Sequence, residues 1–243
     1  MRVALFATCL VDMMRPQVGL ASLALLEAAG CTVEIPDIPC CGQPAYNSGA
    51  RPAALALAQQ VLSALQGYDW VVLPSGSCAG MLRVHYQELL KDQPQELAQW
   101  RALAPRILEL SEFLLQVAAP PRLPLQHAPH QPQSISYHDC CSGLRELGIA
   151  AGPRQLLQQA GVEIREMRDS RACCGFGGAF SLKYGEISAA ICDEKCAQYS
   201  ATAAPALVMG DTGCMLHIEG RMRRQGQDGT VLHYAQILAG QEE

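Results

Sequence analysis

The chain has 243 residues, of which 49% are hydrophobic and 17% are charged. This length and apolar content suffice for one large or two small folded domains with a buried core, and they exclude a disordered or fibrous protein. The net charge is −5, and the largest basic group is Arg221, Arg223 and Arg224, which excludes an extended nucleic-acid-binding surface. The unusual feature is the presence of twelve cysteines.

The N-terminal residues begin with an apolar run that could open a signal peptide. That run, 3–11, is followed at once by Asp12 and Arg15, and it has no small-residue cleavage site. The sequence also lacks a stretch of about 18 uncharged apolar residues, so it predicts no membrane span. We therefore expect a cytoplasmic protein, in which cysteines stay reduced and serve metal or redox chemistry.

Strands and helices are predicted to alternate along the first half of the chain. Short runs rich in β-branched residues predict strands, and apolar residues at helical spacing predict helices. The expected strands are 2–7, 31–35 and 70–73, and the expected helices are 16–29, 52–65 and one that starts near Ala79. A further helical segment, 95–117, is expected to pack on this half.

The second half has the same alternation. Its expected strands are 134–138, 162–167 and 206–209, and its expected helices are 153–160, 179–199 and 215–223. Strands separated by helices predict the α/β class, with parallel sheets and right-handed crossovers. Residues 118–133 contain several prolines without periodicity and are predicted to be a linker, so the expected domains are 1–117 and 134–243.

The two halves are expected to be copies of one module, related by a pseudo-twofold axis. Cys-Cys-Gly occurs at 40–42 and again at 173–175, and single cysteines stand at matching places before and after it. Because the carboxyl ends of parallel strands share one edge of a sheet, four thiols are expected to converge in each module. The candidate ligands are Cys9, Cys40, Cys41 and Cys78 in the first module and Cys141, Cys173, Cys174 and Cys214 in the second.

Four converging thiolates can hold a zinc ion or an iron–sulfur cluster. A structural zinc site usually takes two ligands from one Cys-x-x-Cys turn, and the chain contains no such turn. Adjacent cysteine side chains diverge, which suits a wide cluster better than a single ion. The sequence therefore predicts up to one iron–sulfur cluster per module, with [4Fe-4S] the favoured type, and leaves zinc open as an alternative in one module.

The doubled cysteine pattern resembles the cysteine-rich CCG domain family, which includes a component of heterodisulfide reductase and the glycolate oxidase iron–sulfur subunit. Within it, the stretches 40–49 and 173–181 are most similar to the lactate-utilisation protein A family. This resemblance implies an iron–sulfur electron-transfer subunit of a bacterial L-lactate oxidation complex. It further implies partner proteins B and C, and an oxidoreductase subunit of an L-lactate dehydrogenase complex that is not active alone.

The full CCG pattern ends in Cys-x-x-Cys, and both modules lack its last cysteine. Met81 and His217 stand at these positions, and imidazole is the better metal ligand, so His217 is a further candidate. Cys141 is favoured over Cys140, which is left as a substitute or extra thiol. His138 could hydrogen-bond a sulfur, relay protons or cap a helix. The remaining cysteines are expected to pack in the core: Cys31, Cys192 and Cys196.

Two other functions stay open at the level of sequence. A thiol/disulfide redox enzyme like the heterodisulfide reductases would use a cluster with an open iron site, which the missing fifth cysteine would allow. A zinc-bound structural subunit is the other alternative. The chain has no nucleophile elbow, phosphate-binding loop or dinucleotide-binding glycine motif, which disfavours a hydrolase, an ATPase and a self-contained NAD dehydrogenase.

Overall fold

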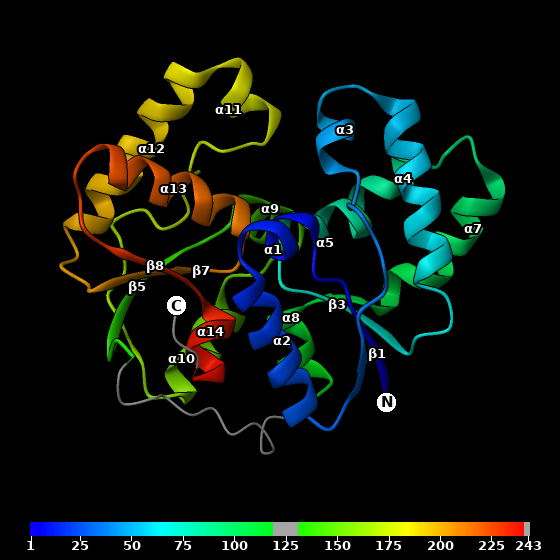
Figure 1. The fold of residues 1–243 in the computed structure, drawn as a ribbon, viewed down its shortest axis with the longest axis horizontal. Helices are drawn as coiled ribbons and strands as arrows, with labels where there is room; N and C mark the ends of the chain where they lie inside the picture. Colours follow the sequence, from blue (N-terminus) through cyan, green and yellow to red (C-terminus); the bar gives the residue numbers. More distant parts are fainter. Residues whose placement is uncertain (119–130, 241–243) are drawn as a thin grey trace. The chain divides into compact units, whose positions relative to one another are not determined.

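The computed structural model describes residues 1–118 and 131–240. The chain divides into two compact units, Met1–Leu123 and Pro124–Glu243, drawn from blue to green and from green to red in Figure 1. Most of the predicted linker, 118–133, lies outside the described residues. Within the described residues, no helix has the length and apolar character needed to cross a membrane.

The first unit is built on a four-stranded parallel sheet with the order β2-β1-β3-β4. Its strands are β1 (Arg2–Leu5), β2 (Thr32–Glu34), β3 (Trp70–Leu73) and β4 (Ile107–Glu109). Residues 3–6 and 71–73 are almost fully buried, as is typical of central strands covered on both faces. The helices are α1 (Cys9–Met14), α2 (Pro16–Ala28), α3 (Gln43–Asn47), α4 (Arg51–Ala64), α5 (Gly76–Gly80), a π-helical turn (Met81–His85), α6 (Tyr86–Leu89), α7 (Pro94–Leu103), a 3₁₀ turn (Ala104–Arg106) and α8 (Leu110–Gln116).

The second unit has a sheet of the same kind, with the order β6-β5-β7-β8. Its strands are β5 (Ser134–His138), β6 (Glu163–Ile164), β7 (Ala206–Met209) and β8 (Thr230–His233). The β7 residues are buried throughout. The helices are α9 (Cys141–Glu146), α10 (Ala151–Gln159), α11 (Ala179–Lys183), α12 (Gly185–Ser200), α13 (Thr212–Arg224) and α14 (Tyr234–Ala239).

The strand order creates a switch point at the centre of each sheet. In the first unit the chain leaves β1 for β2 on one side and then crosses to β3 on the other, so the connections from β1 and β3 run in opposite directions. Strands β5 and β7 have the same relation in the second unit. Open parallel sheets bind ligands at the carboxyl ends of the strands next to such a point. Residues that follow β1, β3, β5 and β7 are therefore the ones best placed to form a site.

The predicted α/β class and the two parallel-sheet modules are confirmed. The strands expected at 70–73, 134–138 and 206–209 have the predicted bounds, and the other expected strands are shorter. The strand β8 was not predicted. The expected helices at 16–29, 52–65, 153–160 and 215–223 are present with small shifts of their ends.

Two of the expected helices were wrong in part. The segment 95–117 is not one helix, because Pro105 cannot continue a helix interior and the buried residues after it form β4, which pairs with β3. The segment 179–199 is two helices, α11 and α12. They are separated at Tyr184, whose backbone leaves the helical region at φ −130° and ψ 52°, and Gly185 then starts α12.

Candidate metal centres

Four cysteines of the first unit lie together at the switch-point end of its sheet. Cys9 is the first residue of α1 and follows β1, Cys40 and Cys41 lie in the loop after β2, and Cys78 lies in α5 after β3. The Sγ atoms of Cys9 and Cys40 are 3.7 Å apart, and those of Cys41 and Cys78 are 3.3 Å apart. The thiols of Cys40 and Cys41 also hydrogen-bond to each other. The four predicted ligands of this unit thus form one continuous group of sulfurs.

Backbone geometry holds this group in place. Gly42 has φ +84°, and its N–H donates to the Cys40 Sγ at 3.4 Å. Ser75 caps helix α5, where its Oγ accepts the N–H of Cys78 at 3.3 Å. The hydroxyl of the buried Tyr86 donates to the carbonyl of Cys41 at 3.0 Å. Glycine is needed at residue 42 because its backbone lies in the left-handed region, which side chains disfavour.

The cap on α5 leads to a stability prediction. Ser75→Ala is expected to lower the free energy of unfolding by about 1 kcal/mol, because an N-cap hydroxyl that satisfies a helix N–H is lost. Ser48→Ala is the control, since Ser48 is exposed and its Oγ donates to the nearby Ala45 carbonyl; a change within about 0.5 kcal/mol is expected. Urea unfolding followed by far-UV circular dichroism measures both. Equal losses in the two variants would contradict the role given to the cap.

The second unit gathers five cysteines instead of four. Cys140 immediately precedes α9, Cys141 starts it, Cys173 and Cys174 lie in the loop before α11, and Cys214 lies in the first turn of α13. The Sγ atoms of Cys174 and Cys214 are 3.2 Å apart. The thiol of Cys140 hydrogen-bonds to the thiols of Cys141 and Cys214, and the thiol of Cys141 hydrogen-bonds to that of Cys173. Cys140 was left as a substitute for Cys141 or an extra thiol, and the structure places both thiols in the group.

The supporting contacts of the second group repeat those of the first. Gly175 has φ +90°, and its N–H donates to the Cys173 Sγ at 3.3 Å. Asp211 caps α13 by accepting the N–H of Cys214 at 3.2 Å, as Ser75 does for α5. The two units therefore build their sulfur groups from the same parts, a left-handed glycine after the cysteine pair and a capped helix under the last cysteine.

In the first group, the thiols compete for negative charge when no cation is present. Hydrogen bonds from Cys41 and Cys9 lower the pKa of Cys40. Hydrogen bonds with Cys40 raise the pKa of Cys9 and of Cys41, and burial raises the pKa of Cys9 further. Adjacent thiols cannot all ionise beside one another without a neutralising charge. A bound metal would supply that charge and allow all of them to become thiolates.

The second group has two thiols whose pKa is lowered. Hydrogen bonds from Cys141 and Cys174 lower the pKa of Cys173. Hydrogen bonds from Cys141 and Cys214 lower the pKa of Cys140 to about 6, although its burial acts in the other direction. The pKa values of the three remaining thiols are raised. This group is therefore the more anionic of the two at neutral pH, which favours a cation at its centre.

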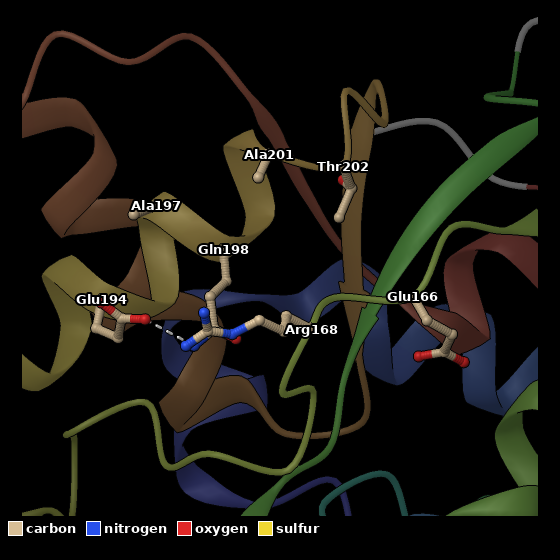
Figure 2. A pocket seen from close by; sticks show the side chains of 7 residues that line it. All are labelled: Glu166, Arg168, Glu194, Ala197, Gln198, Ala201 and Thr202. Carbon is tan, nitrogen blue, oxygen red and sulfur yellow. Dashed lines mark hydrogen bonds between the residues drawn. The ribbon is translucent and has the colours of Figure 1, made fainter.

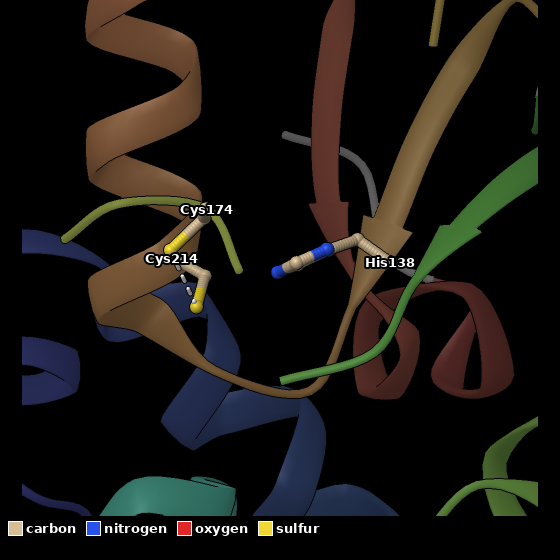
Figure 3. A group of neighbouring side chains, drawn as sticks. All are labelled: His138, Cys174 and Cys214. Carbon is tan, nitrogen blue, oxygen red and sulfur yellow. Dashed lines mark hydrogen bonds between the residues drawn. The ribbon is translucent and has the colours of Figure 1, made fainter. Parts of the chain in front are cut away.

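A buried histidine faces the second group. His138 ends β5 and is fully buried, and Figure 3 shows its ring pointing towards Cys174 and Cys214. One donor atom of each of these three residues lies within 4.8 Å of the other two, and the same holds for Cys140, Asp211 and Cys214. Burial lowers the pKa of His138 to about 4, so its imidazole is neutral at neutral pH. Neither ring nitrogen has a hydrogen-bond partner within the described residues.

Comparison with known proteins identifies the modules. Residues 3–83 and 135–219 each match the cysteine-rich domain family CCG. The chain is 39% identical to lactate utilization protein A of Halalkalibacterium halodurans, over 100% of this chain and 98% of the relative. It is also 39% identical to lactate utilization protein A of Geobacillus kaustophilus, over 98% of each. The chain belongs to the lactate utilization protein A family. The resemblance drawn from the cysteine pattern is thereby confirmed.

A solved structure supports the fold. A crystal structure of a hypothetical protein from Helicobacter pylori aligns with all of this chain at a TM-score of 0.67 and 14% identity. The chain spans about half of that protein, since 49% of it is covered. At this identity the likeness concerns the fold alone.

The other two ligand candidates of this lactate utilization protein A family member, His217 and Met81, have contacts of their own. The Nε2 atom of His217 is 3.2 Å from the Ser188 hydroxyl, and its ring packs 5.8 Å from that of Phe176. His217 also lines a small pocket of 260 Å³ beside α12 and α13. Met81 is fully buried in the core of the first unit. A ligand role for His217 stays a prediction, and the geometry favours His138.

A larger pocket of 490 Å³ lies on the second unit and is shown in Figure 2. In it, Gln198 Nε2 donates to Glu194 Oε1 at 3.1 Å. Its lining contains no cysteine or histidine and consists of Glu166, Arg168, Glu194, Ala197, Gln198, Ala201 and Thr202. We therefore do not assign it to the candidate metal centres.

The residues present at both centres fit a metal–sulfur group. The thiols are close enough to share one centre, with neighbouring Sγ atoms 3.2–3.7 Å apart, and a bound cation would let neighbouring thiols ionise together. In the second unit, three buried polar atoms close to the sulfur group lack a partner within the described residues. Two are the ring nitrogens of His138, and the third is Thr212 Oγ1, which lies in the same helical turn as Cys214. Buried polar atoms without partners often mark a site for an ion or ligand.

Proposed function

We propose that this chain is an iron–sulfur electron-transfer subunit of a bacterial L-lactate oxidation system that works in the cytoplasm. The observation that carries the proposal is the convergence of four or more thiols at the switch point of each module. Family membership supports the assignment to lactate, because the relatives are named lactate utilization protein A. Proteins B and C of the same system are the expected partners.

The chain's own residues would hold one cluster in each module, of the [4Fe-4S] type. The proposed ligands are Cys9, Cys40, Cys41 and Cys78 in the first module, and Cys141, Cys173, Cys174 and Cys214 in the second. The N–H groups of Gly42 and Gly175 already donate to sulfur, and such donors stabilise an anionic cluster. When bound, such a cluster would accept one electron and pass it on.

The oxidation of lactate itself is assigned to another subunit. Removing a hydride or its equivalent from a 2-hydroxy acid needs a cofactor suited to two-electron chemistry. The sequence has no dinucleotide-binding glycine motif, and the candidate centres consist of sulfur donors. The chain is therefore proposed to act as an oxidoreductase subunit that has no lactate dehydrogenase activity alone.

Metal analysis of the anaerobically purified chain tests this proposal. We expect iron and acid-labile sulfide, a visible absorbance that dithionite bleaches, and lactate-dependent dye reduction only when proteins B and C are both added. Cys41→Ala and Cys174→Ala should each remove about half of the iron, because each removes one ligand from one of two centres. Cys31→Ala is the control, since Cys31 is a buried thiol outside both groups.

Three outcomes would contradict the proposal. A full complement of zinc without a reducible chromophore would favour a structural subunit. Turnover of a small disulfide without a requirement for lactate would favour an enzyme like the heterodisulfide reductases. Unchanged iron in both cysteine variants would place the clusters elsewhere in the chain.

A further inference from the structure

The two units correspond residue by residue along their central strands. In the first unit Ala4 of β1 lies opposite Val71 of β3. In the second unit Ser136 of β5 lies opposite Leu207 of β7. Because the paired strands have the same neighbours and order in both sheets, Ala4 and Ser136 occupy the same place. This register allows the residues that follow the two strands to be compared directly.

The comparison shows two differences next to the sulfurs. Two residues beyond the matched pair, Phe6 of the first unit corresponds to His138 of the second. Two residues further on, Thr8 corresponds to Cys140. Phe6 directly follows β1, and His138 is the last residue of β5. Thr8 and Cys140 directly precede α1 and α9. The first unit thus has an apolar ring and a hydroxyl where the second has an imidazole and a thiol.

The imidazole of His138 lacks the contacts that a purely structural histidine would need. It is 0% exposed, and neither nitrogen has a partner within the described residues. Leaving a polar group buried without a partner costs about 1–3 kcal/mol. Its ring points towards Cys174 and Cys214, with a nitrogen within 4.8 Å of both sulfurs. Phe6, the corresponding residue, is equally buried and needs no partner. Coordination of a metal by the ring would explain why the second unit keeps a histidine there.

The thiol of Cys140 also lies close to Cys214. It is 9% exposed, hydrogen-bonds to the thiols of Cys141 and Cys214, and lies within 4.8 Å of the Asp211 carboxylate. Sulfur is a far better ligand than a hydroxyl for iron, zinc and other borderline or soft ions. Thr8 in the first unit could therefore not replace it.

We propose that the metal centre of the second unit is held by two donors that the first unit lacks, a ring nitrogen of His138 and the Sγ of Cys140. The inference rests on the proposed function in that both require metal at the sulfurs. It goes further by making the two centres chemically different, with nitrogen ligation in the second alone.

The test exchanges the corresponding residues. His138→Phe and Cys140→Thr introduce the side chains that the first unit carries at the same places. Each variant is reconstituted anaerobically with iron and sulfide and compared with the unaltered chain. Electron spin-echo spectroscopy of the reduced chain should show coupling to a nitrogen. Labelling the protein with ¹⁵N-histidine should shift the frequency of this coupling by the ratio expected when ¹⁵N replaces ¹⁴N. His138→Phe should remove this signal, whereas the control His217→Phe should keep it.

A second probe does not depend on iron. Co²⁺ alone is added to the reduced, metal-free chain, and its sulfur-to-cobalt absorption measures the affinity. His138→Phe and Cys140→Thr are each expected to weaken the tighter of the two sites by at least about tenfold, since loss of even an indirect partner of a metal ligand costs that much. Cys192→Ala, which alters a fully buried thiol on α12, is the control and should leave the affinity unchanged. Far-UV circular dichroism confirms that each variant is folded.

The outcomes separate this inference from the proposed function. A chain that holds no iron, but loses Co²⁺ affinity on His138→Phe, would refute the iron–sulfur role and support the ligand assignment. Iron-loaded protein without nitrogen coupling, or with coupling that survives His138→Phe, would overturn the assignment of His138. Unchanged Co²⁺ affinity in Cys140→Thr would overturn that of Cys140.

Discussion

Gly175→Ala is expected to lower the free energy of unfolding of the second unit by about 3 kcal/mol or more. A left-handed backbone costs a non-glycine residue about 1–2 kcal/mol, and Gly175 has φ +90°. A Cβ atom there would also stand 2.5 Å from the carbonyl oxygen of Ser188, a backbone atom of α12 that cannot move without the helix. Ser188 in turn donates its hydroxyl to the carbonyl of Gly175 at 2.9 Å, so the collision would disturb this bond as well.

Two other glycines provide matched controls. Gly161 has φ +84° and nothing within 4 Å of the added Cβ, so Gly161→Ala measures the backbone cost alone, about 1–2 kcal/mol. Gly42, the counterpart of Gly175, has φ +84° and its nearest neighbour, the Ala54 carbonyl oxygen, at 3.5 Å. Its alanine variant should resemble Gly161→Ala. Urea unfolding measures all three, and equal losses at 175 and 161 would show that the contact with α12 relaxes without cost.

Arg154→Met is expected to destabilise the second unit by about 3 kcal/mol, because it leaves a buried carboxylate without its partner. Asp139 directly follows β5 and is 2% exposed. Two nitrogens of Arg154 donate to its carboxylate oxygens at 2.6 and 2.9 Å. The guanidinium also bonds to Glu166 at 2.6 Å and lies over the ring of Tyr137. Since Asp139 stands between His138 and Cys140, the loss should reach the second sulfur group too.

Two control variants separate the effect of burying the Arg154–Asp139 ion pair from the effect of leaving a charge unpaired. Arg2→Met removes an ion pair with Glu34 of similar length, 2.7 Å, but both of its side chains are largely exposed, so little change in stability is expected. The double variant Arg154→Met with Asp139→Asn should recover part of the loss, because the remaining buried side chain is then neutral. Thermal unfolding of the four proteins decides. Equal effects of Arg154→Met and Arg2→Met would contradict the cost assigned to the buried carboxylate without its partner.

Much of the fold and most of the sulfur groups could be predicted because their signals are local or repeated. The Cys-Cys-Gly motif occurs twice, and parallel strands bring their carboxyl ends to one edge whatever the details of the helices. Strand β4 was missed because Ile107 and Leu108 also fit the apolar spacing of a helix, and only pairing with β3 selects the extended form. Short apolar runs are ambiguous in this way until their neighbours are known.

The part played by Cys140 could not be derived from its spacing. Adjacent side chains diverge along a strand, so the pattern favoured Cys141 and left Cys140 as a substitute or an extra thiol. The backbone changes between them, however, from extended at Cys140, with φ −60° and ψ 129°, to helical at Cys141, where α9 begins. This change of direction lets both sulfurs reach the same group. The burial of His138 likewise depends on the whole sheet and has no local signature.

Unequal exposure divides the thiols of each unit into an inner and an outer set. Cys41 and Cys78 are 2% and 8% exposed, whereas Cys9 and Cys40 are accessible in part. Cys174 and Cys214 are 2% and 4% exposed, and Cys141 and Cys173 form the accessible pair beside them. Oxidants in aerated buffer attack accessible thiolates first. Damage in air is therefore expected to begin with sulfenic acids or disulfides at the outer pairs, which thiol reductants reverse, while the inner pairs are shielded and stay reduced.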